Sequence, residues 1–223
     1  MKAVIFDMDG VIVDSEAQWR VLEYEFFHAT LPTWREHHHE QIVGMGVEDV
    51  YHYLVREFGL TLGRSEYMQR SEEVARKVYL QHAELADGFI ALALGLKHRG
   101  IRTAIASSAP SRWIALVLDR FSLSPLLDEV VSADDVGGKT KPLPDIYLEA
   151  AARLQIPTAE CLAIEDSSIG LLAAKRAGMR VAAFRSTHNE SQDLSAADFE
   201  LSGFDGLDYE RLVARLKLAA DAS

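Results

Sequence analysis

The stretch MKAVIFDMDG, residues 1–10, decides the fold. Residues 3–6 are an unbroken apolar run, and Asp7, Asp9 and Gly10 follow it at once. A short apolar run without alternation is typical of a strand buried on both faces, as in a parallel sheet. Carboxylates at the end of such a strand lie where open α/β sheets bind ligands, and glycine permits a tight turn there. An acidic turn that only ends the strand explains the same residues, so this stretch alone leaves both interpretations open.

Similar apolar runs recur along the chain, and helical patterns lie between them. The further runs are residues 101–106, 130–131, 162–164 and 181–184. Apolar residues at helical spacing indicate helices at 111–121, 145–154 and 167–177, with one more at 207–220. Alternating strands and helices predict right-handed βαβ units and therefore a parallel sheet. We expect an α/β fold, a Rossmann-like three-layer sandwich.

Residues 15–86 differ from the rest of the chain. They are rich in Glu, Arg, His and aromatic residues, and they show helical periodicity with no convincing strand. Pro32, the Gly44–Gly46 pair and Gly59 divide the periodic segments, as helix breakers do. We therefore predict an inserted α-helical domain at 15–86 and a catalytic α/β core domain made of residues 1–14 and 87–223.

Composition excludes several classes of protein. The chain has 223 residues, and its formal net charge of −11 argues against nucleic-acid binding, which needs a basic surface. No apolar run is long enough to span a membrane, and the first ten residues turn acidic too early for a signal peptide. The single cysteine, Cys161, excludes an intrachain disulfide and fits a reducing compartment. We expect a cytoplasmic monomer that binds neither nucleic acid nor membranes.

A second pair of carboxylates, Glu165 and Asp166, directly follows the apolar run 162–164. Carboxylate oxygens that converge from two strands are the ligands that Mg²⁺ prefers in proteins. Asp166 and Ser167 also suit a plain cap on the next helix, so this pair alone leaves both interpretations open.

Two hydroxyls and a lysine follow the other strands. Ser107 and Ser108 end the run 101–106 just before a helix, where N–H groups can bind an anion, although helix capping explains them too. Lys141 begins the stiff turn KPLPD, whereas most loop lysines are simply solvated. Because the carboxyl ends of parallel strands meet at one sheet edge, the clusters together predict a site for phosphate and Mg²⁺.

Four segments of the chain resemble, in order and spacing, the four motifs of the haloacid dehalogenase-like superfamily of phosphohydrolases. They are DMDGVIVDSE, IASS, KPLPDIYLEAA and IEDSSIG. Within that superfamily the chain is most similar to sugar-phosphate phosphatases and β-phosphoglucomutase, and residues 15–86 take the place of the family's small helical cap. The resemblance implies a Mg²⁺-dependent phosphatase acting on small phosphorylated metabolites, sugar phosphates in particular.

The resemblance also implies a role for each motif residue. Asp7 matches the nucleophile that becomes an aspartyl-phosphate, and Asp9 matches the general acid and base. Mg²⁺ would be held by the Asp7 carboxylate, the Asp9 backbone carbonyl and Asp166, with Glu165 nearby as a direct or water-mediated ligand. The phosphoryl oxygens would be held by Lys141, Ser107 and Ser108.

The cap is expected to decide the substrate. Its candidate contacts are Trp19 and the loop Gly44, Met45, Gly46 and Val47. The mutase has a histidine where this chain has Trp19 and an arginine where it has Val47, so the resemblance favours a phosphatase over the alternative, a phosphosugar mutase. Trp19 also suits plain packing. A phosphorylation-switched receiver module is disfavoured, because it would need neither Asp9 nor the insert.

The run His37-His38-His39 invites a metal site. Consecutive helical residues point about 100° apart and cannot converge on one ion. We expect a solvated face of the cap instead.

Overall fold

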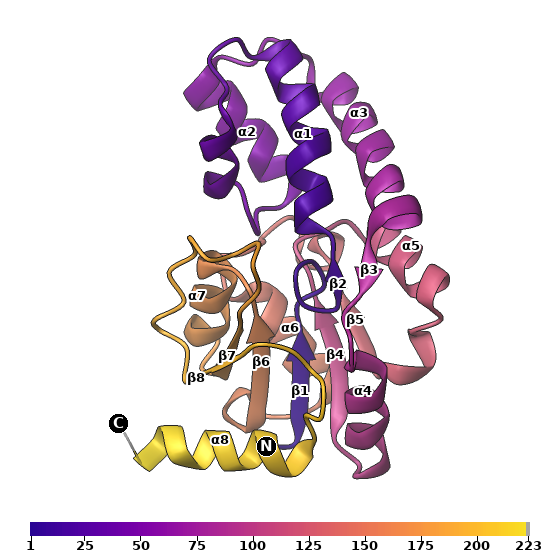
Figure 1. Cartoon of the computed structure of the whole chain (residues 1–223), viewed down its shortest axis with the longest axis vertical. Helices are drawn as coiled ribbons and strands as arrows, with labels where there is room; N and C mark the ends of the chain where they lie inside the picture. The colour runs from indigo at the N-terminus through magenta and orange to yellow at the C-terminus, as the bar shows by residue number, and fades with distance from the viewer. Residues whose placement is uncertain (222–223) are drawn as a thin grey trace.

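The computed structural model describes residues 1–221. A six-stranded sheet lies at its centre, in the order β5-β4-β1-β6-β7-β8, and every neighbouring pair is parallel (Figure 1). The central strand β1 (Ala3–Phe6) pairs with β4 (Arg102–Ala106) and β6 (Cys161–Glu165). The outer strands are β5 (Glu129–Val131), β7 (Arg180–Phe184) and β8 (Phe199–Leu201).

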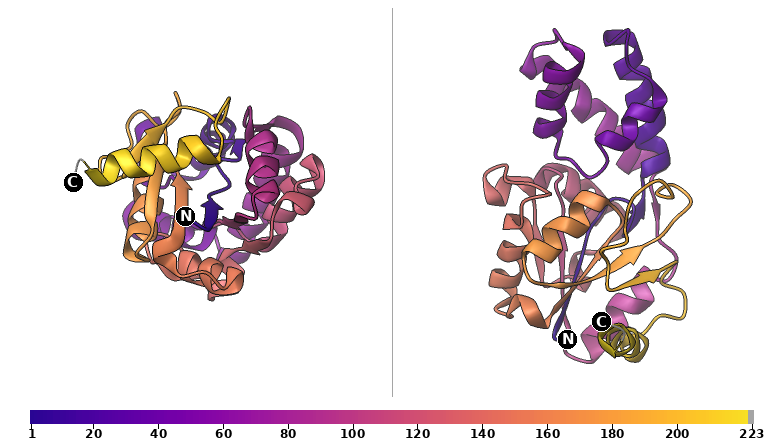
Figure 2. Two further views of the ribbon diagram at one scale, coloured as in Figure 1. Left: turned by 90° about the horizontal axis from the view of Figure 1, so that it is seen from below. Right: turned by 90° about the vertical axis from the view of Figure 1, so that its left-hand side faces the viewer.

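Helices cover both faces of the sheet (Figure 2). Val4 and Phe6 of β1 pack with α4 (Phe89–His98), α5 (Ser111–Phe121) and α8 (Tyr209–Asp221). Ala3 and Ile5 point to the other face and pack with α6 (Asp145–Leu154) and α7 (Ser168–Arg176). This two-sided burial is the reason why the strand sequence is apolar without alternation. Short 3₁₀ turns complete the core: η3 (Ser124–Leu126), η4 (Ala133–Val136) and η5 (Thr158–Glu160).

A helical cap lies beyond the carboxyl ends of the strands (Figure 1). It consists of α1 (Glu16–Thr30), the 3₁₀ helix η1 (Glu36–Gln41), α2 (Val47–Phe58), α3 (Arg64–Lys77) and the π-helical turn η2 (Val78–His82). The cap has its own apolar cluster, which includes Phe27, Trp34, Leu54 and Tyr67. Two short antiparallel strands, β2 (Val13–Asp14) and β3 (Glu84–Leu85), connect the cap to the core.

The predicted fold class is confirmed. The helices expected at 111–121 and 145–154 are found with those bounds. The edge strand β8 and the β2–β3 pair were not expected, because each has only two or three residues. Within residues 1–221, no helix combines the length and apolar character that crossing a membrane requires.

Candidate active site

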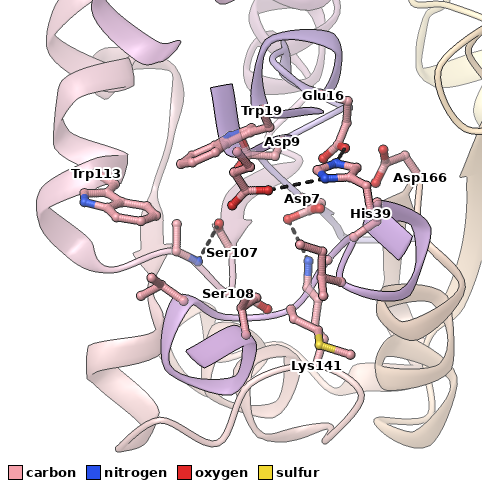
Figure 3. Close-up of a pocket in the computed structure, with 18 of the residues that line it drawn as sticks. Asp7, Asp9, Glu16, Trp19, His39, Ser107, Ser108, Trp113, Lys141 and Asp166 are labelled. Carbon is pink, nitrogen blue, oxygen red and sulfur yellow. Dashed lines mark hydrogen bonds and ion pairs between the residues drawn. The ribbon is translucent and has the colours of Figure 1, made fainter. Parts of the chain in front are cut away.

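The loop after β1 places Asp7 at the centre of a buried site (Figure 3). The Asp7 backbone N–H donates to the Ile164 carbonyl at 3.0 Å, so the loop starts in line with β6. Gly10 turns the chain back with φ +72°, and a Cβ there would lie 1.9 Å from Oδ2 of Asp166. Only glycine therefore permits both the turn and the approach of Asp166 to this loop.

Lys141 joins the carboxylates of two strands. Its Nζ lies 2.6 Å from Asp7 and 2.5 Å from Glu165, and the lysine side chain is 1% exposed. Burial opposes the charged form, but the two carboxylates raise the pKa of Lys141 overall. The Tyr147 hydroxyl also donates to Glu165. Lys141 is thus a fixed, fully charged group directed at Asp7, and not a solvated loop lysine.

Three acidic side chains at the carboxyl ends of β1 and β6 form a compact group. Asp7, Glu165 and Asp166 each offer an oxygen within 4.8 Å of the others, and all three are buried. Burial and then repulsion from Glu165 raise the pKa of Asp7 to about 8, although Lys141 acts in the opposite direction. Burial likewise raises the pKa of Asp166 well above its usual range. One lysine is therefore too little positive charge for this group of carboxylates.

A divalent cation fits this group. Among the described residues, Oδ2 of Asp166 is buried without a hydrogen-bond partner, which marks it as a free ligand atom. Both Glu165 oxygens are occupied, one by Lys141 and Tyr147 and the other by the Ser167 hydroxyl at 3.3 Å. An all-oxygen, acidic set of this kind suits Mg²⁺.

Asp9 lies apart from the group and is held by hydroxyls. Ser15 donates to it at 2.6 Å, and Tyr79 of η2 donates to both of its oxygens at 3.0 Å. Burial raises the pKa of Asp9 to about 6, although the Ser15 hydrogen bond works against this. A carboxyl with that pKa can give and take a proton near neutral pH. Tyr79 was not expected, since it lies 70 residues from Asp9 in the chain.

The loop after β4 brings two hydroxyls to the same pocket. Ser107 accepts from the Ala109 backbone N–H at 3.1 Å, which fixes its side chain. Ser108 Oγ is buried without a hydrogen-bond partner among the described residues. Ser167 caps α7, as the sequence allowed: it accepts from the Gly170 N–H at 3.2 Å and also donates to Glu165 at 3.3 Å.

The cap loop touches the core on both sides of the site. A Cβ on Gly44 would lie 2.8 Å from Ser167 Oγ, and one on Gly46 would lie 3.1 Å from Thr140. Asp49 of α2 accepts a hydrogen bond from Thr140 at 2.5 Å. Gly44, Met45 and Val47 line the pocket, whereas Gly46 packs against the core beside it.

Trp19 is packed between aromatic rings and also borders the pocket. Its ring lies 5.5 Å from that of Trp113 on α5 and 5.7 Å from that of Tyr79, and it is 9% exposed. It also lines the pocket together with Asp7 and Asp9. Trp19 therefore packs across the boundary between cap and core and forms one wall of the site.

The expectation of a solvated histidine face is wrong for His39. His37 is exposed, but His39 is 4% exposed and lies between Glu16 and Glu23 of α1. Glu16, Glu23 and His39 all line the pocket. The 3₁₀ helix η1 directs successive side chains to different sides, and the side chain of His39 meets the α1 carboxylates. Glu16, Trp19 and Glu23 are spaced so that they lie on one face of a helix, and this pattern indicates the face of α1 that lines the pocket. It was not recognised in the sequence.

Comparisons with known proteins agree with this geometry. A family model described as haloacid dehalogenase-like hydrolase matches residues 1–178. Putative phosphatase YhcW of Bacillus subtilis is 35% identical over 187 residues, covering 81% of each chain. Hexitol phosphatase B of Escherichia coli is 29% identical over 180 residues, covering 80% of this chain and 81% of its own. Beta-phosphoglucomutase of B. subtilis is 33% identical over 189 residues, with 80% and 81% covered.

A solved structure shares the whole fold. The crystal structure of CbbY from Rhodobacter sphaeroides in complex with phosphate superposes with a TM-score of 0.83 at 24% identity. The match covers 96% of this chain and 99% of CbbY, so the cap and core are both included.

Proposed function

Because the chain belongs to the haloacid dehalogenase-like hydrolases, we propose that it is a Mg²⁺-dependent phosphatase of small phosphorylated metabolites, in particular sugar phosphates. The resemblance seen in the motifs is confirmed at the level of the family, and relatives named as phosphatases support a phosphoric monoester hydrolase. The observation that carries the proposal is the placement of Asp7, which lies 2.6 Å from the buried Lys141 in one pocket with Asp9.

The proposed reaction uses Asp7 and Asp9 in two steps. A carboxylate oxygen of Asp7 attacks phosphorus, the bond from phosphorus to the leaving oxygen breaks, and Asp9 gives its proton to that oxygen. An aspartyl-phosphate and the free alcohol result. Asp9 then takes a proton from water, whose oxygen attacks the same phosphorus, and phosphate leaves as the Asp7 carboxylate forms again. The pKa of Asp9, raised by burial to about 6, supports both its roles.

Lys141 and the two serines have the task of holding the phosphoryl group. A carboxylate that approaches a phosphate dianion is repelled, so the transferring oxygens need positive charge and hydrogen-bond donors around them. Lys141 supplies the charge, and the Ser107 and Ser108 side chains lie in the same pocket.

Mg²⁺ would be held by the Asp7 carboxylate, the Asp9 backbone carbonyl and Asp166, with the Glu165 carboxylate next to them. When bound, it would supply the positive charge that lets the anionic nucleophile meet the anionic substrate. The partnerless Oδ2 of Asp166 supports a direct role for that residue. The occupied oxygens of Glu165 support a role in fixing Lys141, with contact to the metal through water.

The cap would contact the part of the substrate beyond the phosphate. Trp19 and the loop of Gly44, Met45 and Val47 line the pocket, and Gly46 sets the loop against the core. The indole of Trp19 offers an apolar surface to a sugar ring, but it cannot accept a proton from a sugar hydroxyl. This favours water as the phosphoryl acceptor and a phosphatase over a mutase.

The test is phosphate release from a panel of sugar monophosphates by the purified chain. Release should require Mg²⁺ and should be lost in Asp7→Asn, which keeps the side-chain shape but removes the anionic nucleophile. The same samples, supplied with β-glucose 1-phosphate and catalytic glucose 1,6-bisphosphate, are analysed for glucose 6-phosphate. Isomer formation with little free phosphate would replace the phosphatase with a mutase.

A further inference from the structure

Three polar side chains on the cap wall of the pocket have no part in the proposed phosphoryl transfer. Glu16 and Glu23 come from α1, and His39 comes from η1. Nδ1 of His39 lies 3.4 Å from Glu23, and Nε2 lies 3.7 Å from Glu16. Figure 3 labels His39 and Glu16 in the same pocket as Asp7 and Asp166. We refer to these three residues as the cap triad.

Within the cap triad His39 is buried, Glu16 and Glu23 are half-buried, and one nitrogen of His39 makes no hydrogen bond. His39 is 4% exposed, and the side chains of Glu16 and Glu23 are 15% and 18% exposed. The distance of 3.7 Å from Nε2 of His39 to Glu16 is too long for a hydrogen bond. Nε2 has no other partner among the described residues. A buried ring nitrogen without a partner is costly, and purely structural histidines are normally satisfied on both sides. Nε2 is therefore available to an atom that enters the pocket.

The charges of the cap triad restrict what that atom can be. Burial alone would lower the pKa of His39, but Glu16 and Glu23 raise it overall, which favours an imidazolium that donates at both nitrogens. Burial raises the pKa of Glu23 to about 7. An alcohol hydroxyl can accept a hydrogen bond from His39 and donate one to a neighbouring carboxylate. The triad holds one cation between two acidic side chains, so it offers no net positive charge to a second phosphate or to a substrate carboxylate.

We infer that the cap triad recognises hydroxyl groups of the leaving alcohol, so that the preferred substrate is the monophosphate of an uncharged polyol or sugar. This inference rests on the proposed phosphatase function and names the chemical class of its substrate. His39 and Glu23 would act in binding and specificity, and not in the proton transfers proposed for Asp9.

The test compares two substrates in the full-length chain with Mg²⁺. Glucitol 6-phosphate presents several hydroxyls, and p-nitrophenyl phosphate presents none on its leaving group. We expect His39→Leu to lower the ratio of kcat/KM for glucitol 6-phosphate to that for p-nitrophenyl phosphate by about 10- to 100-fold, the range for a lost hydrogen bond to a charged group. His37→Leu, an exposed neighbour on the same 3₁₀ helix, should leave the ratio unchanged.

Two further variants keep the inference testable if His39→Leu does not fold. His39→Gln retains a donor amide and should lower the ratio less than Leu does. Glu23→Gln removes an acidic group of the triad, so at a pH above 7, where Glu23 is ionised, it should lower the same ratio and raise activity on fructose 1,6-bisphosphate relative to fructose 6-phosphate. An equal loss on both substrates, or an unchanged ratio in the folded variants, would overturn hydroxyl recognition. A wild-type chain no more active than Asp7→Asn on p-nitrophenyl phosphate would overturn the proposed phosphatase itself, and the inference with it.

Discussion

Replacing Gly170 by alanine tests whether Glu165 is held in the position that fixes Lys141. Gly170 lies in α7, and a Cβ added there would be 2.2 Å from Cδ and both oxygens of the Glu165 carboxylate. Nonbonded Cβ contacts below 3.0 Å essentially do not occur, so the carboxylate must move by about 1 Å. Glu165 is 0% exposed and bonded through both oxygens, so it has no free direction in which to move.

The magnitude follows from three contributions. Alanine is a better helix former than glycine by up to about 1 kcal/mol, which stabilises the variant. Overpacking a buried site costs about 1–3 kcal/mol, and a lost hydrogen bond to a charged group costs roughly 1.5–3 kcal/mol. We expect Gly170→Ala to lower the free energy of unfolding by about 2–4 kcal/mol. At roughly 2–4 °C per kcal/mol for a chain of this size, Tm should fall by about 5–15 °C.

The matched control is Gly95→Ala in α4. A Cβ on Gly95 meets nothing within 4 Å, so only the gain in helix propensity remains, and Tm should rise by roughly 2–4 °C. Thermal unfolding followed by circular dichroism measures both variants. Phosphate release well below Tm should fall at least about tenfold in Gly170→Ala only, because Lys141 is displaced. If Gly170→Ala unfolded at or above the wild-type Tm with full activity, the described packing around Glu165 would be refuted.

Three further outcomes are expected. Asp7→Asn should lose several decades of kcat in the phosphate-release assay, and near-normal turnover would exclude a covalent role. In calorimetric titration with Mg²⁺, Asp166→Ala should weaken binding. Asp9→Asn should largely keep it, since the expected ligand from Asp9 is its backbone carbonyl. Weaker Mg²⁺ binding in Asp9→Asn than in Asp166→Ala would exclude the assigned roles. Asp198→Ala should lower the free energy of unfolding by about 1–3 kcal/mol at pH 7, because Asp198 accepts hydrogen bonds from Lys175 and the Val181 N–H. Burial would raise the pKa of Asp198, yet those hydrogen bonds lower it overall. The stabilisation by Asp198 is therefore present above its unfolded pKa near 3.9, and it should vanish as the pH falls through the lower pKa of the folded state. A stability difference from wild type that persisted at lower pH would contradict this.

The core of the fold was predictable because its signals are local. A strand buried on both faces is apolar throughout, and runs such as residues 3–6 and 181–184 stand out without any partner. The strand β8, Phe199–Leu201, is a three-residue edge strand and carries no such signal. The predicted division into residues 1–14 with 87–223 and an insert at 15–86 stays a prediction.

Parts of the site were predictable by topology. Asp7, Ser107 and Asp166 each follow a strand of one parallel sheet, so their meeting at one edge follows from the fold. The contact between Tyr79 and Asp9 depends on how the cap packs onto the core, and no local pattern indicates it. His39 was assigned to a solvated face because consecutive histidines cannot converge on one ion, but its environment is set by the carboxylates of another helix.

The hydrogen bond from Thr140 to Asp49 has a thermodynamic consequence. Thr140 is adjacent to Lys141, so the segment proposed to hold the phosphate also holds α2 of the cap. If phosphate binding orders this segment, it strengthens the grip on the cap, and cap closure must then strengthen phosphate binding by the same factor. Inorganic phosphate left after turnover would accordingly shift the cap toward its closed state. The affinity for product phosphate and the equilibrium between the closed and the open cap would thus report the same coupling free energy.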